Sequence, residues 1–164
     1  TEMIKVSTLA SSNYLENRNR SMADINMKGF FDLTSAIISS ARHNKTNWLI
    51  VEGTTDKIYL DIYLTGNCRI LPVKGAASVL TLYEYLRSPM SQPMDLSEDS
   101  GKVFCLIDSD TSNTKRIESS NDYDHLIVRR LQYSSHSKDV ELKSLDLDPT
   151  YTATGIEDCL ESSI

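Results

Sequence analysis

The chain has 164 residues, of which 40% are hydrophobic, and this is enough for one domain with a single core. Its formal net charge of -6 at pH 7 argues against a protein that coats DNA through a generally basic surface. No apolar run approaches the roughly 18 residues of a membrane span, and no basic-then-apolar leader opens the sequence, so we expect a cytoplasmic protein without a membrane partner.

The N-terminal part of the chain is polar before it becomes periodic. Residues 1–28 show no clear period apart from one short strand-like piece at Met3–Val6. From Gly29 the apolar residues recur at helical spacing, which predicts a helix through about Arg42 that covers one face of a sheet. We therefore divide the chain into an N-terminal segment with its covering helix, 1–46, and an α/β domain, 47–164.

Strand-like and helical patterns then alternate. Asn47–Val51 is a short continuous apolar run, which is typical of a strand buried on both faces of a parallel sheet. The next helix is predicted to begin near Asp56, with Thr54 or Thr55 as its cap, and to end near Gly66. Further elements complete the alternation: a strand at Cys68–Val73, a helix from Gly75 or Ser78 that Ser88-Pro89 stops, and a strand at Lys102–Ile107.

The last part of the chain carries a different pattern. Two β-prone segments, Leu126–Tyr133 and Val140–Leu145, flank a polar stretch and predict a β-hairpin insertion. A final helical signal starts at Thr154 and runs through Leu160, and we expect the domain to be incomplete at its C-terminus. The predicted fold class is therefore α/β, with an open, mainly parallel sheet flanked by helices and a possible hairpin insertion.

Acidic residues follow two of the predicted strands. Glu52 and Asp56 come after the first strand, and Asp108 and Asp110 come after the third. In open parallel sheets the ligand site lies beyond the carboxyl ends of the strands, where these acids would meet. Because gathered carboxylates repel one another unless a cation neutralises them, the pattern predicts a Mg²⁺ site and favours phosphodiester chemistry.

Each acid also has a simpler explanation. Asp108-Ser109-Asp110 alone reads as a turn, and Asp56 alone suits the first turn of a helix. Thr154-x-x-Glu157 is a capping-box pattern that needs no catalysis. The argument for a metal site is therefore the ordered combination of the acids.

Other chemistry-bearing residues give weaker signals. Lys74 could reach a phosphate near the acids, and the hairpin carries basic residues that could face a phosphate backbone, although exposed strands often carry such charges. The three histidines are scattered and read as surface residues, and the three cysteines read as buried, reduced thiols. The basic residues of the hairpin are Arg129, Arg130, Lys138 and Lys143, the histidines are His43, His125 and His136, and the cysteines are Cys68, Cys105 and Cys159.

Three segments in order resemble the Toprim domain, especially that of OLD-family nucleases and related bacterial antiphage proteins. They are Leu49–Asp56 (LIVEGTTD), Ile70–Gly75 (ILPVKG) and Val103–Asp110 (VFCLIDSD), and the resemblance covers roughly residues 48–160. The first and third segments are the specific ones.

The resemblance implies a Mg²⁺- or Mn²⁺-dependent nuclease that acts on DNA or RNA. Glu52, Asp108 and Asp110 would be the catalytic acids, and Asp56 and Glu157 would add metal ligands. OLD proteins couple this site to an ATPase, but the Walker A pattern G-x-x-x-x-G-K-[ST] does not occur here. An ATPase domain or subunit would then lie elsewhere in a multi-subunit antiphage assembly, or be lacking.

Two other readings stay open. One is a noncatalytic Toprim-like or receiver-like module whose acids bind a regulatory ion. The other is a Toprim fragment of a topoisomerase or primase, for which the chain shows no accompanying module. A receiver would carry an acidic pair after its first strand, whereas here a single glutamate ends that strand and the pair ends the third.

Overall fold

The computed structural model describes residues 22–91, 97–109, 123–134, 136, 138–145 and 153–159. The strand-like piece predicted at Met3–Val6 and the candidate ligand Asp110 lie outside these residues. No helix in the described part of the chain is long and apolar enough to cross a membrane.

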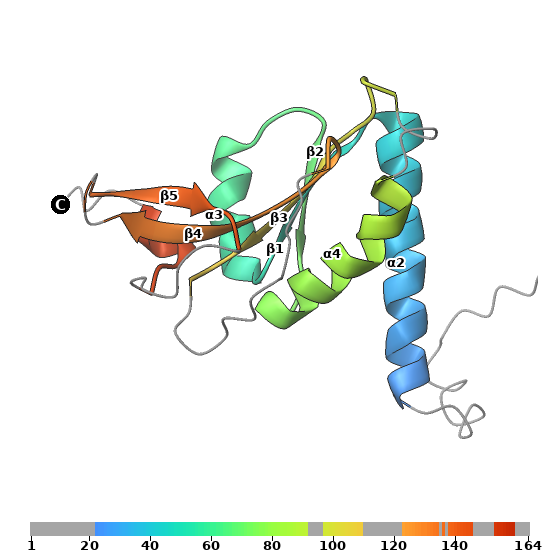
Figure 1. Ribbon diagram of the computed structural model, residues 1–164, viewed down its shortest axis with the longest axis horizontal. Helices are drawn as coiled ribbons and strands as arrows, with labels where there is room; N and C mark the ends of the chain where they lie inside the picture. The colour runs from blue at the N-terminus through green and yellow to red at the C-terminus, as the bar shows by residue number, and fades with distance from the viewer. Residues whose placement is uncertain are drawn as a thin grey trace, which may run out of the picture.

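A five-stranded sheet of order β2-β1-β3-β4-β5 forms the centre of the fold (Figure 1). Its strands are β1 (Asn47–Val51), β2 (Cys68–Pro72), β3 (Val103–Ile107), β4 (Leu126–Ser134) and β5 (Asp139–Lys143). The first four run parallel to their neighbours, and β4 and β5 form an antiparallel hairpin. The predicted fold class is confirmed, since the sheet is mainly parallel, is flanked by helices and carries the hairpin.

Helices cover the two faces of this sheet. Helices α2 (Met22–Asn44) and α4 (Ala76–Met90) pack together on one face, and α3 (Thr54–Tyr63) lies on the other (Figure 1). The larger core cluster joins α2 and α4 to β1, β3 and β4, with Tyr83 and Leu86 fully buried. A smaller cluster lies under α3, where Leu49, Val51 and Leu106 are buried. The continuous apolar strands thus have cover on both faces.

Several helix ends differ from the prediction. Helix α2 begins at Met22 rather than Gly29, because polar residues hide helical periodicity in the sequence. The N-cap of α3 is Gly53, not a threonine, and its backbone N–H donates to Asp56 Oδ2 at 2.9 Å. Helix α4 continues past the predicted stop to Met90, which is buried, while Pro89 occupies the last turn and its carbonyl accepts a hydrogen bond from Arg42.

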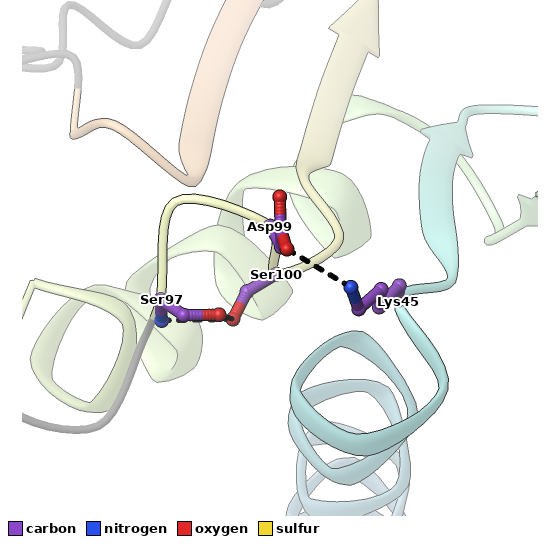
Figure 2. A network of polar contacts seen from close by, with 4 residues as sticks. All are labelled: Lys45, Ser97, Asp99 and Ser100. Carbon is purple, nitrogen blue, oxygen red and sulfur yellow. Dashed lines mark hydrogen bonds and ion pairs between the residues drawn. The ribbon is translucent and has the colours of Figure 1, made fainter.

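The edge of the sheet at which β1 and β3 begin is closed by a polar network and one close backbone contact. Figure 2 shows Lys45 pointing to Asp99, with Nζ and Oδ2 3.1 Å apart, and Ser97 beside Ser100. The N–H of the next residue, Gly101, donates to the carbonyl of Ala41 at 2.8 Å. A Cβ on Gly101 would lie 2.1 Å from the carbonyl oxygen of Thr46, so this position has no room for a side chain.

We predict that Gly101→Ala lowers the free energy of unfolding by about 3 kcal/mol, because the added methyl group meets backbone that cannot rotate away. Urea unfolding of the variant measures the change. Gly29→Ala is the matched control. Gly29 is exposed in α2, and a Cβ added there would have no atom within 4 Å, so alanine should raise the free energy of unfolding by about 1 kcal/mol. A Gly101→Ala chain as stable as wild type would contradict the close contact.

Candidate metal centre

Glu52 and Asp108 lie at the same edge of the sheet because β1 and β3 are parallel neighbours. Each residue follows its strand directly, and the register pairs Ile50 with Cys105. The backbone N–H of Asp108 donates to Glu52 Oε1 at 2.8 Å. The two acids are therefore in direct contact, as the strand order of the sequence required.

Asp56 enters the same region from the first turn of α3. Its side chain is buried, with 9% exposed, and one carboxylate oxygen accepts the hydrogen bond from Gly53. This contact satisfies a backbone donor at the start of the helix, which is the simpler explanation for the residue. The charge of the Asp56 carboxylate is also one of the causes that raise the pKa of Asp108.

A second acidic arm comes from the end of the described chain. Ser109 and Thr154 form an isolated antiparallel bridge, with N–H to O distances of 2.9 Å and 2.8 Å in the two directions. The 3-10 helix η2 (Ile156–Cys159) follows, and Ile156 packs into the core cluster under α3. The helix predicted from Thr154 through Leu160 is thus a single 3-10 turn in the described residues.

The acid that caps this turn is Asp158, one residue after the predicted Glu157. The N–H of Gly155 donates to Asp158 Oδ2 at 2.8 Å, so Asp158 acts as the capping acid, and the predicted pairing of Thr154 with Glu157 is wrong. Glu157 is exposed, and its carboxylate lies next to Gly155. A Cβ built on Gly155 would lie 2.8 Å from Glu157 Oε2 and 3.7 Å from Asp108 Oδ2.

Burial and the neighbouring carboxylates change the ionisation of Asp108. Burial raises its pKa from 3.8 to about 7, with further contributions from the charges of Glu52, Asp56, Glu157 and Asp158, in that order. A carboxyl group with such a pKa is only partly ionised at neutral pH when no cation is bound. The cluster therefore carries negative charge that a cation would relieve.

The donor set fits a hard divalent cation. Carboxylate oxygens are the ligands that Mg²⁺ and Mn²⁺ prefer, and the charges of four other carboxylates act on Asp108 here. Within the described ranges, however, no three Asp, Glu, His or Cys side chains are already arranged as a metal-binding group. Glu52 and Asp56 each accept a hydrogen bond from a backbone N–H on one oxygen, which leaves other lone pairs of each carboxylate for an ion.

Sequence reasoning missed two residues of this region. The capping role of Asp158 was not predicted, although Ile156-Glu157-Asp158 matches a later acidic motif of the Toprim resemblance, because the turn is too short to show a period. Gly155 was not singled out either, because its closeness to two carboxylates arises only from the bridge between Ser109 and Thr154. Asp110 lies outside the described residues, so its predicted role stays a prediction.

Among the weaker candidates, Lys74 is exposed at the end of β2, beside Gly75, whose N–H donates to the Glu52 carbonyl at 3.0 Å. Arg130 is buried, with 6% exposed, which contradicts its expected role on an exposed strand face. Two other expectations are also wrong: His125 is buried rather than on the surface, and Cys159 is exposed rather than buried. Cys105 is buried and Cys68 half-buried, His43, His136 and Lys138 are exposed, and Arg129 and Lys143 are half-buried.

Comparison with known proteins adds no relative: no family model, curated protein or solved structure matches the chain. The resemblance to the Toprim domain therefore rests on the three sequence segments alone.

We predict that Asp108→Asn raises the free energy of unfolding at neutral pH but not in acid. Its folded-state pKa of about 7 exceeds the 3.8 of the unfolded chain, so wild-type stability falls as pH rises from 3.8 to about 7. Because the side chain is partly exposed, the gain above that range should be on the order of 1 kcal/mol. Urea unfolding at several pH values, without divalent ions, measures it.

The control for this prediction is Asp99→Asn, at the other edge of the sheet. Asp99 is exposed and pairs with Lys45, so its replacement should change stability by less than about 1 kcal/mol. A gain from Asp108→Asn that is equally large near pH 4 and pH 8 would show that repulsion among the carboxylates is not its source.

Proposed function

We propose that the chain is the nuclease domain of a Mg²⁺- or Mn²⁺-dependent enzyme that hydrolyses phosphodiester bonds in DNA or RNA. The observation that carries this proposal is the contact between Glu52 and Asp108 at one edge of the sheet, where the charges of Asp56 and Glu157 also act on Asp108. The raised pKa of Asp108 supports it, because perturbed carboxyl groups are a property of functional sites.

Within this proposal Glu52, Asp108 and Asp110 are the catalytic acids, and Asp56 and Glu157 complete the set that would hold the ion. When bound, the ion would activate water and neutralise the charge of the phosphate. The chain itself orients the acids: the Asp108 N–H holds the Glu52 carboxylate, and Asp56 fixes the turn between β1 and α3. Glu52 and Asp108 thus directly follow two paired strands, which gives them the rigid support that a catalytic site requires.

The acidic balance of the chain also constrains how it would bind its substrate. With a net charge of -6, long-range attraction of a polyanion is unfavourable, so contact must come from the ion and from local cations. Lys74 is exposed beside the loop that contacts the Glu52 backbone, so it suits a contact with substrate phosphate. Buried Arg130 does not suit this role.

A noncatalytic metal-binding module is the second candidate. The carboxylates that act on Asp108 could hold a regulatory ion in such a module as well as a catalytic one. Such a module would bind Mn²⁺ without cleaving nucleic acid, so one cleavage assay separates the two candidates.

We further propose that the domain works in an assembly with an ATPase, as the effector of an antiphage system. The OLD-like segments and the missing Walker A pattern motivate this step. Exposed apolar side chains support a partner surface: Ile58 and Ile62 of α3 are 65% and 71% exposed, and Phe31 of α2 is 65% exposed. Surfaces of this kind mark interaction sites in many proteins.

We predict that wild-type chain cleaves supercoiled DNA or transfer RNA when Mn²⁺ is present, and that Asp108→Asn or Glu52→Gln lowers the rate about 100-fold or more. Glu52→Gln keeps an oxygen that can accept the Asp108 N–H, so the loss would reflect charge rather than folding. Gel analysis of initial rates, with circular dichroism of each variant, provides the measurement.

The matched control is Glu84→Gln, which replaces an exposed glutamate on α4 that pairs with Arg87. Its cleavage rate should equal that of the wild type. Cleavage at the wild-type rate by a folded Asp108→Asn/Glu52→Gln chain would refute the proposed site. Mn²⁺ binding without cleavage would favour the noncatalytic module.

We predict that the native full-length protein copurifies with an ATPase and that ATP changes its cleavage rate. Ile62→Asp should weaken the association without unfolding the domain, because Ile62 is 71% exposed on α3. Affinity purification followed by size-exclusion chromatography tests this, with exposed Thr81→Asp on α4 as the control. A protein that stays monomeric beside its genomic neighbours and is indifferent to ATP would refute the assembly but not the nuclease.

A further inference from the structure

Strand β5 forms an outer edge of the sheet, and the contacts of its neighbour β4 show which way its backbone groups point (Figure 1). The N–H of Tyr133 on β4 donates to Thr154 Oγ1 at 2.8 Å, and Thr154 pairs with Ser109. The carbonyl of Leu131 on β4 accepts a hydrogen bond from the hydroxyl of Ser109, which follows β3. These two residues of β4 therefore direct backbone groups toward the β3 side and away from β5.

The alternation within an antiparallel pair then gives the direction of the β5 backbone. Residues that lie opposite each other alternate between pairs that exchange hydrogen bonds and pairs that do not. Val140 lies opposite Tyr133, and Leu142 lies opposite Leu131, so these are the pairs that do not exchange hydrogen bonds. The N–H and C=O groups of Val140 and Leu142 thus point to the outer side of β5, where no other strand of the described residues pairs.

The side chains along this edge combine an exposed leucine with an acid and a base. Leu142 is 53% exposed, although it lies opposite Leu131, which is buried in the core cluster under α3. Glu141 and Lys143 lie on the other face of the strand, where their side chains form an ion pair. The apolar layer under α3 therefore ends at an uncovered Leu142, beside which the opposite face carries both signs of charge.

A second copy of β5 fits this edge in one antiparallel register. In a two-fold pair of identical strands, one residue faces its own counterpart. Centring the pair on Asp139, Glu141 or Lys143 places two identical charges opposite each other, and centring it on Val140 places Asp139 opposite Glu141. Centring it on Leu142 places Glu141 of each copy opposite Lys143 of the other, and the two leucines opposite each other. Among the registers centred on a residue of β5, this one alone faces no like charges, which would destabilise the pair.

We infer that β5 is a self-association edge, through which two copies of the chain form a two-fold dimer with one continuous sheet centred on Leu142. The inference goes beyond the proposed nuclease and does not depend on it. Leu142 of each copy exchanges its outward backbone hydrogen bonds with Leu142 of the other, and Glu141 pairs with Lys143 across the interface. The other edge strand, β2, ends at Pro72, which has no N–H to donate, so it suits such pairing less.

Sedimentation equilibrium of the full chain tests the dimer. Because one strand from each copy makes a small interface, we expect a monomer–dimer equilibrium with a Kd of about 10–100 µM. Leu142→Lys should raise this Kd about tenfold or more, since two lysines would then face each other in place of two leucines. Ile58→Lys is the matched control: it places the same side chain at an aliphatic residue of α3 that is 65% exposed, and it should leave the Kd unchanged.

Exchange of the two charges tests the register. Glu141→Lys and Lys143→Glu each place like charges opposite each other, so each should raise the Kd about tenfold. The double variant Glu141→Lys/Lys143→Glu restores opposite charges across the interface and should dimerise as the wild type does. In a pair centred on Glu141 the same double variant would face two lysines, so the rescue is specific to the Leu142 register. Circular dichroism of each variant should give a thermal midpoint within about 3 °C of wild type.

Three results would overturn the inference and leave the proposed nuclease intact. They are a wild-type chain that stays monomeric up to about 500 µM, well above the expected Kd, a dimer that Leu142→Lys leaves unchanged, and a double variant that associates no better than the single variants.

Discussion

The parallel pairing of β1 with β3 is the constraint on which the rest of the molecule depends. It places Leu49 beside Phe104 and Ile50 beside Cys105 in the middle of the sheet, where both faces have helical cover. It also brings together two acids that are 56 residues apart in the chain, so that the backbone of Asp108 holds the side chain of Glu52. The same strand pairing therefore builds part of the core and positions two acids of the candidate site.

In this arrangement the favourable burial of apolar residues opposes the unfavourable ionisation of a buried acid. Burial and four neighbouring negative charges raise the pKa of Asp108 to about 7, which costs folding free energy whenever the group is ionised. Apolar contacts that offset the cost lie close to the acids in the sequence: Val51 and Leu106, near the ends of their strands, are buried in one cluster with Ile156, which anchors the turn that carries Glu157. A structure that accepts such a cost at one edge is typical of a site kept for function.

The sequence predicts an element correctly where a single hydrophobic pattern or a short-range rule determines its structure. The continuous apolar runs of β1 and β3 marked their strands to within one residue, and with them the edge at which Glu52 and Asp108 meet. It does not predict an element whose structure depends on a tertiary contact. The final turn is short because burial of Ile156 and the bridge at Thr154 hold it, and neither can be read from local spacing.

The same limit explains the caps and the buried polar residues. Gly53 replaces a threonine as the cap of α3 because Asp56 reaches back to its N–H. Arg130 is buried on β4, two residues after buried Val128 on the same face of the strand. Local propensity favours other outcomes in both cases, and packing overrides it.

Gly101 gives the fold a different kind of rigidity. Its Cα faces the carbonyl of Thr46 so closely that no substitution fits, and its N–H ties the start of β3 to the end of α2. The acids at the opposite edge could be exchanged during divergence while the chain still folds, because no close packing depends on their carboxylates. A change at Gly101 would instead weaken the fold itself. Descendants of this chain would therefore be expected to keep this glycine longer than they keep the carboxylates.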